Sequence, residues 1–273
     1  MFRLQTVHFL TLFLASNWTF SQSDSINATD DTTRVYSDTT HFDHQLGGSK
    51  FKQVHHKKAA DECVIFVNLH ENEQTSIDAL KKYSQDTLLT YTYLEHGGER
   101  RISFTIGNEK YNFDPNRIFT KKGRKRTLKD GGNHSNKANK QVEKFATNFL
   151  WSISESYAIV SVHNNTDSNY SILSYMPSGS ESKNTDSLFI NPEMDPDDFI
   201  YTTNLAFYQT MVKHKVSVIL QDNKKFVNDG SLSVYCAKRL CYVNIETEHG
   251  HLDKQLELLK LVHKVLGEQA VIK

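Results

Sequence analysis

The feature that most constrains the fold is the alternation of short apolar runs with longer amphipathic segments after about residue 60. Four mostly apolar runs are expected to be buried strands: Val64–Val67, Ala158–Val162, Val216–Leu220 and Tyr242–Ile245. Helices are expected at about Ser76–Leu88, Gln141–Ser154, Phe199–Lys213 and Leu252–Leu266. Strands without a polar face need cover on both sides of a sheet. The pattern therefore predicts an α/β fold, as a single domain with a mixed, mostly parallel central sheet flanked by helices.

Other segments give weaker signals. Leu89–Leu94 and Ile102–Ile106 are predicted as further strands. Lys121–Lys140 is basic and contains several glycines and asparagines, which predicts a loop. The polar stretch Asn164–Asp198 is expected to hold no clear element beyond a short strand near Ile172–Tyr175.

Residues 1–22 are expected to be a secretory signal peptide. A short basic start precedes the apolar stretch Leu4–Ala15, and small or polar residues follow it. This stretch is too short to span a bilayer, and a buried helix is the alternative. Residues 23–58 are polar without apolar periodicity, so we expect a flexible segment there and a functional domain at 59–273. The predicted location is secreted or periplasmic.

Charge and cysteine content narrow the class of partner. The 32 basic and 32 acidic residues balance, so nothing favours nucleic acid or an anionic membrane as a partner. Three cysteines fit an oxidising compartment. Cys236 and Cys241 flank a plausible turn and could form a disulfide, which would leave Cys63 over. Metal binding by these cysteines is disfavoured, because no CxxC spacing occurs.

Three of the apolar runs end in side chains that can bind a metal or carry a proton. His70 and Glu73 follow the first run, His163 the second and Glu246 the fourth. Since α/β sheets bind ligands at the carboxyl ends of their strands, these side chains are expected to converge. Two histidines and one carboxylate leave a position open for water, as at catalytic zinc, and a second carboxylate could move the proton. The alternatives are an ordinary polar loop and a surface acid.

A further motif lies between the first two clusters. The segment Asp114–Phe119 reads D-x-N-R-x-F, and His70–Glu73 before it reads HxxE. Followed by a strand ending in His and a late strand ending in Glu, this order resembles the zinc carboxypeptidase family, including its succinylglutamate desuccinylase and aspartoacylase branch. The resemblance covers roughly Cys63–Leu266. It implies a zinc-carboxypeptidase-like fold and a Zn2+ cofactor.

The resemblance also implies roles in metal binding and proton transfer. His70, Glu73 and His163 would bind the zinc ion. Glu246 would act as the general base and acid, with Glu248 as the competing candidate, because Glu246 directly follows the apolar run.

Substrate-binding roles follow from the same resemblance. Asn116 and Arg117 would bind a substrate carboxylate, Arg117 through its guanidinium fork, although this turn-prone segment could instead be structural. An arginine near the metal would stabilise the oxyanion, and Arg101 is preferred over Arg100. Glu71 departs from the deacylase branch, which usually has glycine at that position.

Together these features predict an exported zinc-dependent hydrolase that cleaves an amide bond. A carboxypeptidase acting on peptides or cell-wall peptides is preferred, because the deacylase branch works inside cells. The alternatives are a zinc-dependent deacylase of small N-acyl amino acids, a non-catalytic exported binding protein of the same fold, and an α/β domain with coincidental motifs. The expected partner is a peptide or a small amide bearing a carboxylate, with no nucleic acid and no membrane span.

Overall fold

The computed structural model describes residues 38–57, 64–154, 156–166, 170–239 and 241–271. All of them belong to one unit of the chain, residues 35–273. The predicted signal segment and Cys63 lie outside the described residues.

A nine-stranded sheet runs through this unit in the order β1-β2-β4-β3-β7-β11-β9-β10-β8. Its strands are β1 (Asp38–Leu46), β2 (Ser49–Lys57), β3 (Val64–Asn68), β4 (Thr90–Glu95), β7 (Ala158–Asn165), β8 (Thr185–Phe189), β9 (Phe199–Thr202), β10 (Val218–Gln221) and β11 (Cys241–Glu248). The central strands β4, β3, β7 and β11 are parallel to one another. Antiparallel pairing begins on either side of them, at β2 and at β9. The predicted mixed sheet with a parallel centre is confirmed.

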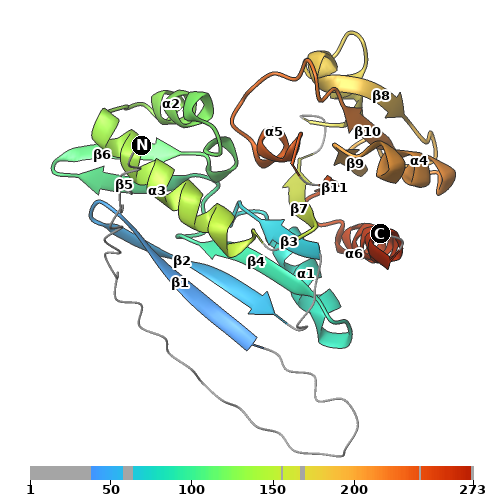
Figure 1. Ribbon diagram of the computed structural model, residues 1–273, viewed down its shortest axis with the longest axis horizontal. Coiled ribbons are helices and arrows are strands. Elements are labelled where there is room, and N and C mark those ends of the chain that lie inside the picture. Colours follow the sequence, from blue (N-terminus) through green and yellow to red (C-terminus); the bar gives the residue numbers. More distant parts are fainter. Residues whose placement is uncertain (1–37, 58–63, 155, 167–169, 240, 272–273) are drawn as a thin grey trace, which may run out of the picture. The chain divides into compact units, whose positions relative to one another are not determined.

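Helices cover both faces of the sheet (Figure 1). They are α1 (Gln74–Asp86), α2 (Lys121–Asp130), α3 (Asn136–Ser152), α4 (Leu205–Lys213), α5 (Leu232–Cys236) and α6 (Leu252–Val271). Ile65 of β3 belongs to the core cluster that contains Phe149 of α3. Its neighbour Phe66 belongs to the opposite cluster, with Leu80 of α1 and Leu259 of α6. Both faces of β3 are therefore buried, which explains its continuous apolar sequence.

The short connection after strand β6 (Glu109–Phe113) contains Asn116 and Arg117, the two residues predicted to bind a substrate carboxylate. The hairpin of β5 (Ile102–Ile106) and β6 leads into the 3-10 helix η1 (Pro115–Arg117). Asp114 begins this turn, because its Oδ1 accepts a hydrogen bond from the backbone N of Asn116 at 2.7 Å. Among the helices described, none is long and apolar enough to cross a membrane.

Residues 38–57 form two strands of the main sheet, so the flexible segment predicted for 23–58 is wrong over this part. β2 pairs with β4 as well as with β1. Histidines and lysines occupy most positions around buried side chains such as Phe51, which conceals the strand pattern. Gly47 makes the turn between the strands at φ 55°, and a Cβ there would lie 1.7 Å from the carbonyl oxygen of Thr105.

The prediction of a loop at Lys121–Lys140 is wrong, because most of these residues form α2 and the start of α3. Thr120 caps α2, since its hydroxyl accepts a hydrogen bond from the backbone N of Gly123 at 3.1 Å. The buried face of α2 is narrow and includes Leu128. Because most residues of α2 are charged or polar, its narrow buried face leaves no clear hydrophobic pattern in the sequence.

Three further predictions of secondary structure are wrong. The stretch Asn164–Asp198, expected to hold no other clear element, contains strand β8. The expected helix Phe199–Lys213 begins instead with the buried strand β9. Asn204 then starts α4, because its Oδ1 accepts a hydrogen bond from the backbone N of Phe207 at 2.9 Å. The short strand expected at Ile172–Tyr175 is the 3-10 helix η2, which Ser171 caps.

The disulfide considered between Cys236 and Cys241 is not formed. Cys236 ends α5, Cys241 begins β11, and both side chains are buried. Burial raises the pKa of the Cys236 thiol to about 12.

His55 in β2 should make the stability of this sheet pH-dependent. Its Nδ1 has no hydrogen-bond partner in the described part of the chain, and burial lowers its pKa from 6.5 to about 4. The imidazole of His55 binds a proton more readily in the unfolded chain than in the folded one. The free energy of unfolding should therefore fall by about 2 kcal/mol as the pH drops from 6.5 to about 4. Urea unfolding at about pH 7 and about pH 4.5 should show a smaller loss for His55→Gln. The exposed His41→Gln control should keep the full loss; equal losses in both variants would contradict this role.

Candidate metal centre and pocket

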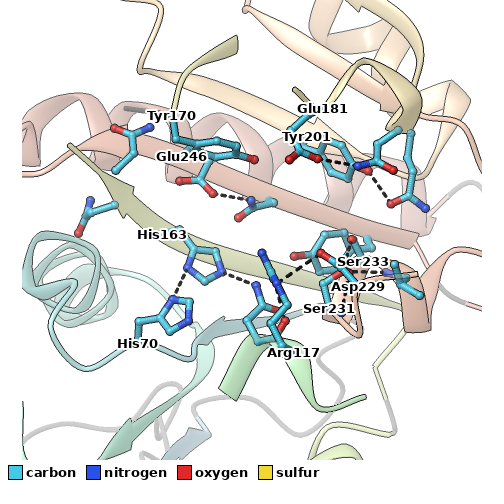
Figure 2. Close-up of a pocket in the computed structure, with 18 of the residues that line it drawn as sticks. His70, Arg117, His163, Tyr170, Glu181, Tyr201, Asp229, Ser231, Ser233 and Glu246 are labelled. Atoms are coloured by element: carbon cyan, nitrogen blue, oxygen red, sulfur yellow. Dashed lines mark hydrogen bonds and ion pairs between the residues drawn. The ribbon is translucent and has the colours of Figure 1, made fainter. Parts of the chain in front are cut away.

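The four side chains predicted at strand ends lie at one place in the structure. His70 follows β3, and Glu73 is the N-cap residue of α1. His163 lies in β7, and Glu246 pairs with it in register on the adjacent parallel strand β11. Paired residues of adjacent strands point to the same face of a sheet. Figure 2 shows His70, His163 and Glu246 together on one side of the cavity.

His70, Glu73 and His163 form a compact, buried group of possible metal ligands. Glu73 Oε1 lies 2.8 Å from His70 Nδ1, and Glu73 Oε2 lies 2.7 Å from His163 Nδ1. The two Nδ1 atoms are 3.3 Å apart. One carboxylate and two imidazole nitrogens that face one another form a donor set of the kind that zinc prefers. The residues present therefore fit a zinc ion.

Asp114 and Arg100 surround this group. His70 Nε2 lies 2.9 Å from Asp114 Oδ1, which holds the ring so that Nδ1 faces the other two ligands. Arg100 donates from Nη1 to Glu73 Oε1 at 2.6 Å, and its Nη2 lies 3.8 Å from Asp114 Oδ2. A carboxylate oxygen therefore lies within hydrogen-bond distance of each ring nitrogen of His70.

The electrostatics of the group favour ionised carboxylates. Burial alone would raise the pKa of Glu73, but His70 and His163 hold it well below its usual range. Burial would also lower the pKa of His70, whereas Glu73 and Asp114 raise it to about 9. A cation bound at His70 Nδ1 would replace a proton there, so metal binding and proton release are linked.

Removing the carboxylate of Asp114 should weaken metal binding. In Asp114→Asn the ring of His70 loses its negative partner, and we expect zinc affinity to fall by about 10- to 100-fold. Competition with a chromophoric chelator measures this affinity. Asp86→Asn, at the exposed end of α1, is the matched control and should bind zinc as the parent does. An unchanged affinity in Asp114→Asn would show that Asp114 does not orient His70.

Glu246 is buried and lines the cavity next to the proposed ligands. Its Oε1 accepts a hydrogen bond from Asn244 Nδ2 at 2.8 Å. Burial is the main cause that raises its pKa; His163 opposes this effect and Glu73 adds to it. Glu248, the competing candidate, is absent from the lining of the cavity. A carboxyl group with a raised pKa beside a metal site can accept and return a proton.

Asn116 and Arg117 lie on another wall of the same cavity. Asn116 Oδ1 accepts a hydrogen bond from the backbone N of Leu232 at 3.1 Å, and its Nδ2 lies 3.5 Å from His163 Nε2. Arg117 Nε lies 3.4 Å from Asp229 Oδ2, and Nη1 donates to the carbonyl oxygen of Asn116 at 2.8 Å. The side chain of Arg117 is 38% exposed, so its other N–H groups can reach a bound anion.

The structure corrects the choice between the two adjacent arginines. Arg101 points away from the cavity, where its Nη2 donates to the carbonyl oxygen of Thr127 at 2.8 Å and its Nε contacts Asn112. Arg100 lines the cavity and contacts Glu73. Adjacent side chains leave the backbone in different directions, so their order in the sequence does not show which one enters the site.

A cavity of about 510 Å³ joins these walls. The sequence did not reveal several side chains of its lining: Tyr170, Tyr175, Glu181, Tyr201 and Asp229. Tyr170 lies beside Glu246, and its hydroxyl contacts that of Tyr175 (Figure 2). Three of the five come from the polar stretch 164–198, where no hydrophobic period indicates their direction.

Comparisons with known proteins give distant structural matches. No protein-family model matches the sequence, and no curated protein matches it. A solved structure described as a "putative metallopeptidase" from Shewanella amazonensis is 11% identical, covers 80% of this chain and 82% of its own, and has a TM-score of 0.38. One with the same description from Shewanella denitrificans is 12% identical, covers 80% and 79%, and has a TM-score of 0.41.

An aspartoacylase family protein from Mesorhizobium loti is 10% identical, covers 83% of this chain and 67% of its own, and has a TM-score of 0.39. At such identities and TM-scores the matches assign no residue roles.

Proposed function

We propose that this protein is a zinc-dependent hydrolase that cleaves an amide bond beside a substrate carboxylate, as a carboxypeptidase-type peptidase does. One observation carries the proposal. The facing Nδ1 atoms of His70 and His163, with the carboxylate of Glu73, lie at a cavity that also holds Glu246 and Arg117. A zinc ion at these ligands supplies Lewis-acid polarisation of a carbonyl group and lowers the pKa of a bound water molecule.

The chain's own residues divide the remaining tasks. Glu246 accepts a proton from the attacking water and delivers it to the leaving amine, for which its raised pKa suits it. Asn116 and Arg117 bind the substrate carboxylate and so position the scissile bond. Arg100 offers guanidinium N–H groups to the oxyanion that develops in the transition state.

The two arginines give a matched test of oxyanion stabilisation. Arg100→Ala should lower kcat by about 100- to 1,000-fold, because a preorganised donor is lost where negative charge develops. Arg101→Ala should leave kcat within about threefold of the parent value, since Arg101 contacts Thr127 outside the cavity. Steady-state kinetics and thermal unfolding of both variants separate catalysis from folding. If the Arg101 variant showed the larger loss of kcat at equal stability, the assignment of Arg100 would fail.

The substrate class is open to a direct test. Purified protein should contain close to one zinc per chain by mass spectrometry of the metal, and chelation should abolish hydrolysis. Peptides with a free C-terminal carboxylate should be cleaved, and their amidated counterparts should not. Cleavage of both series would remove the carboxypeptidase assignment, and cleavage of N-acyl amino acids alone would indicate a deacylase. Absence of zinc from the purified protein would overturn the hydrolase proposal.

Export is also proposed, because the signal-like stretch Leu4–Ala15 lies in residues 1–22. Expression of the full chain in its own cells should yield a mature protein that starts near residue 23 and is found outside the cytoplasm. N-terminal sequencing and cell fractionation measure both properties. A mature chain that retains Met1 would contradict this proposal.

A further inference from the structure

Glu181 lies on the wall of the cavity opposite the proposed metal ligands. In Figure 2, Glu181 and Tyr201 are on the far side of the cavity from His70 and His163. Glu181 precedes the short 3-10 helix η3 (Ser182–Asn184), and its Oε2 accepts a hydrogen bond from Asn184 Nδ2 at 2.6 Å. This wall therefore belongs to the same cavity as the proposed metal ligands but lies across it from them.

Among the described acidic residues of the cavity, Glu181 and Glu246 take part in no ion pair, and Glu246 is the one beside the proposed metal ligands. Glu73 contacts two histidines and Arg100, and Asp229 pairs with Arg117. Arg100 and Arg117 are the arginines that line the cavity in the described part of the chain, and both are engaged elsewhere. Within the described residues no ion pair involves Glu181. A partly buried carboxylate without a cation attracts one from a ligand.

Aromatic side chains line the approach to Glu181. Tyr175, Tyr201 and Phe226 all face the cavity, and the rings of Tyr175 and Tyr201 lie 5.5 Å apart. The Tyr201 hydroxyl donates to Gln221 Oε1 at 2.6 Å, so its oxygen can still accept a hydrogen bond from a ligand. Ring faces pack well against the methylene stem of lysine or arginine and attract its charged end. The wall thus suits a long side chain with a cationic tip.

We propose that this wall is the specificity site for a basic side chain, and that the enzyme prefers peptides ending in lysine or arginine. The inference rests on the proposed function. A terminal carboxylate at Asn116 and Arg117, with the scissile carbonyl at the metal ligands, leaves the terminal side chain facing the wall of Glu181. The guanidinium or ammonium group meets the Glu181 carboxylate and the Tyr201 oxygen.

Kinetics with matched peptides test the preference. Acylated dipeptides ending in arginine, lysine, citrulline, leucine or glutamate are compared with the full-length protein. Citrulline has the shape of arginine without its charge, so kcat/KM for arginine should exceed that for citrulline by about 10- to 100-fold. Glu181→Gln should reduce this ratio to within about threefold and leave the leucine substrate unaffected. Glu193→Gln, at an exposed acid outside the cavity, should retain the preference of the parent.

Binding measured without turnover separates this inference from the proposed function. Calorimetry should show that free arginine binds more tightly than free citrulline to the parent, and that Glu181→Gln abolishes the difference. If leucine or citrulline peptides are cleaved as well as arginine peptides, or the variant keeps the preference, the basic specificity is overturned while the hydrolase remains. If no peptide is cleaved but arginine binding depends on Glu181, the basic site stands and the peptidase proposal fails.

Discussion

Replacing Glu246 by glutamine should lower kcat by about 100- to 10,000-fold while the zinc content stays unchanged. Glutamine fills the same space and can keep a hydrogen bond with Asn244, but its amide cannot accept and return a proton. KM should change little, since the carboxylate acts in proton transfer and is not among the residues proposed to bind the substrate carboxylate. Steady-state kinetics with metal analysis of the same sample measures both quantities.

Glu248→Gln is the control for this result. Glu248 lies two residues further along β11 and does not line the cavity, so its variant should keep kcat within about threefold of the parent. A Glu246→Gln variant with full metal content and full activity would remove the proton-transfer role. A larger loss of kcat in Glu248→Gln would transfer that role to Glu248.

Replacing Glu73 by glutamine should abolish metal binding and activity together. The amide retains the size of the carboxylate but loses the negative charge that faces the Nδ1 atoms of His70 and His163. Zinc per chain should fall from about one to near zero after dialysis, and hydrolysis should fall with it. Metal mass spectrometry, with circular dichroism to confirm folding, measures the effect.

Glu71→Gln provides the comparison within the same motif. The Glu71 carboxylate accepts hydrogen bonds from the backbone N of His96 and of Gly98, the latter at 2.8 Å, and is not among the grouped ligands. Its variant should bind zinc normally, with any loss confined to stability. If Glu73→Gln retained zinc and Glu71→Gln lost it, the ligand assignment would be wrong.

The sequence allowed much of the parallel centre, and the grouping of the candidate metal ligands, to be predicted. His70, His163 and Glu246 each follow or end an apolar run, and such runs show both their burial and the edge at which they end. Their convergence could be expected because ligands bind at the carboxyl ends of parallel strands, although the order of the strands cannot be derived from a hydrophobic pattern. The positions of Asn116 and Arg117 at the cavity came from motif resemblance alone, because a turn carries no periodic signal.

Features that depend on irregular backbone could not be predicted. Tyr170 and Glu181 lie in a stretch held by caps, turns and short 3-10 helices, whose direction depends on contacts remote in sequence. Arg100 and Arg101 are adjacent just before β5, and only the backbone direction there decides that Arg100 contacts Glu73 while Arg101 contacts Thr127. Strands β1 and β2 were missed because their buried side chains include polar ones such as Gln53, which hydrogen-bonds Thr92 inside the sheet.

The pairing of His163 with Glu246 on adjacent parallel strands means that the backbone sets the distance between a proposed metal ligand and the proposed proton-transfer group. Neighbouring strands lie about 4.8 Å apart in every sheet, and helices buttress both faces of this one. Glu181 belongs to a different segment, between β7 and β8. If Glu181 selects substrates as proposed, mutations in that segment would change which substrates are accepted without altering the spacing of His163 and Glu246, so chemistry and selectivity could evolve separately in this chain.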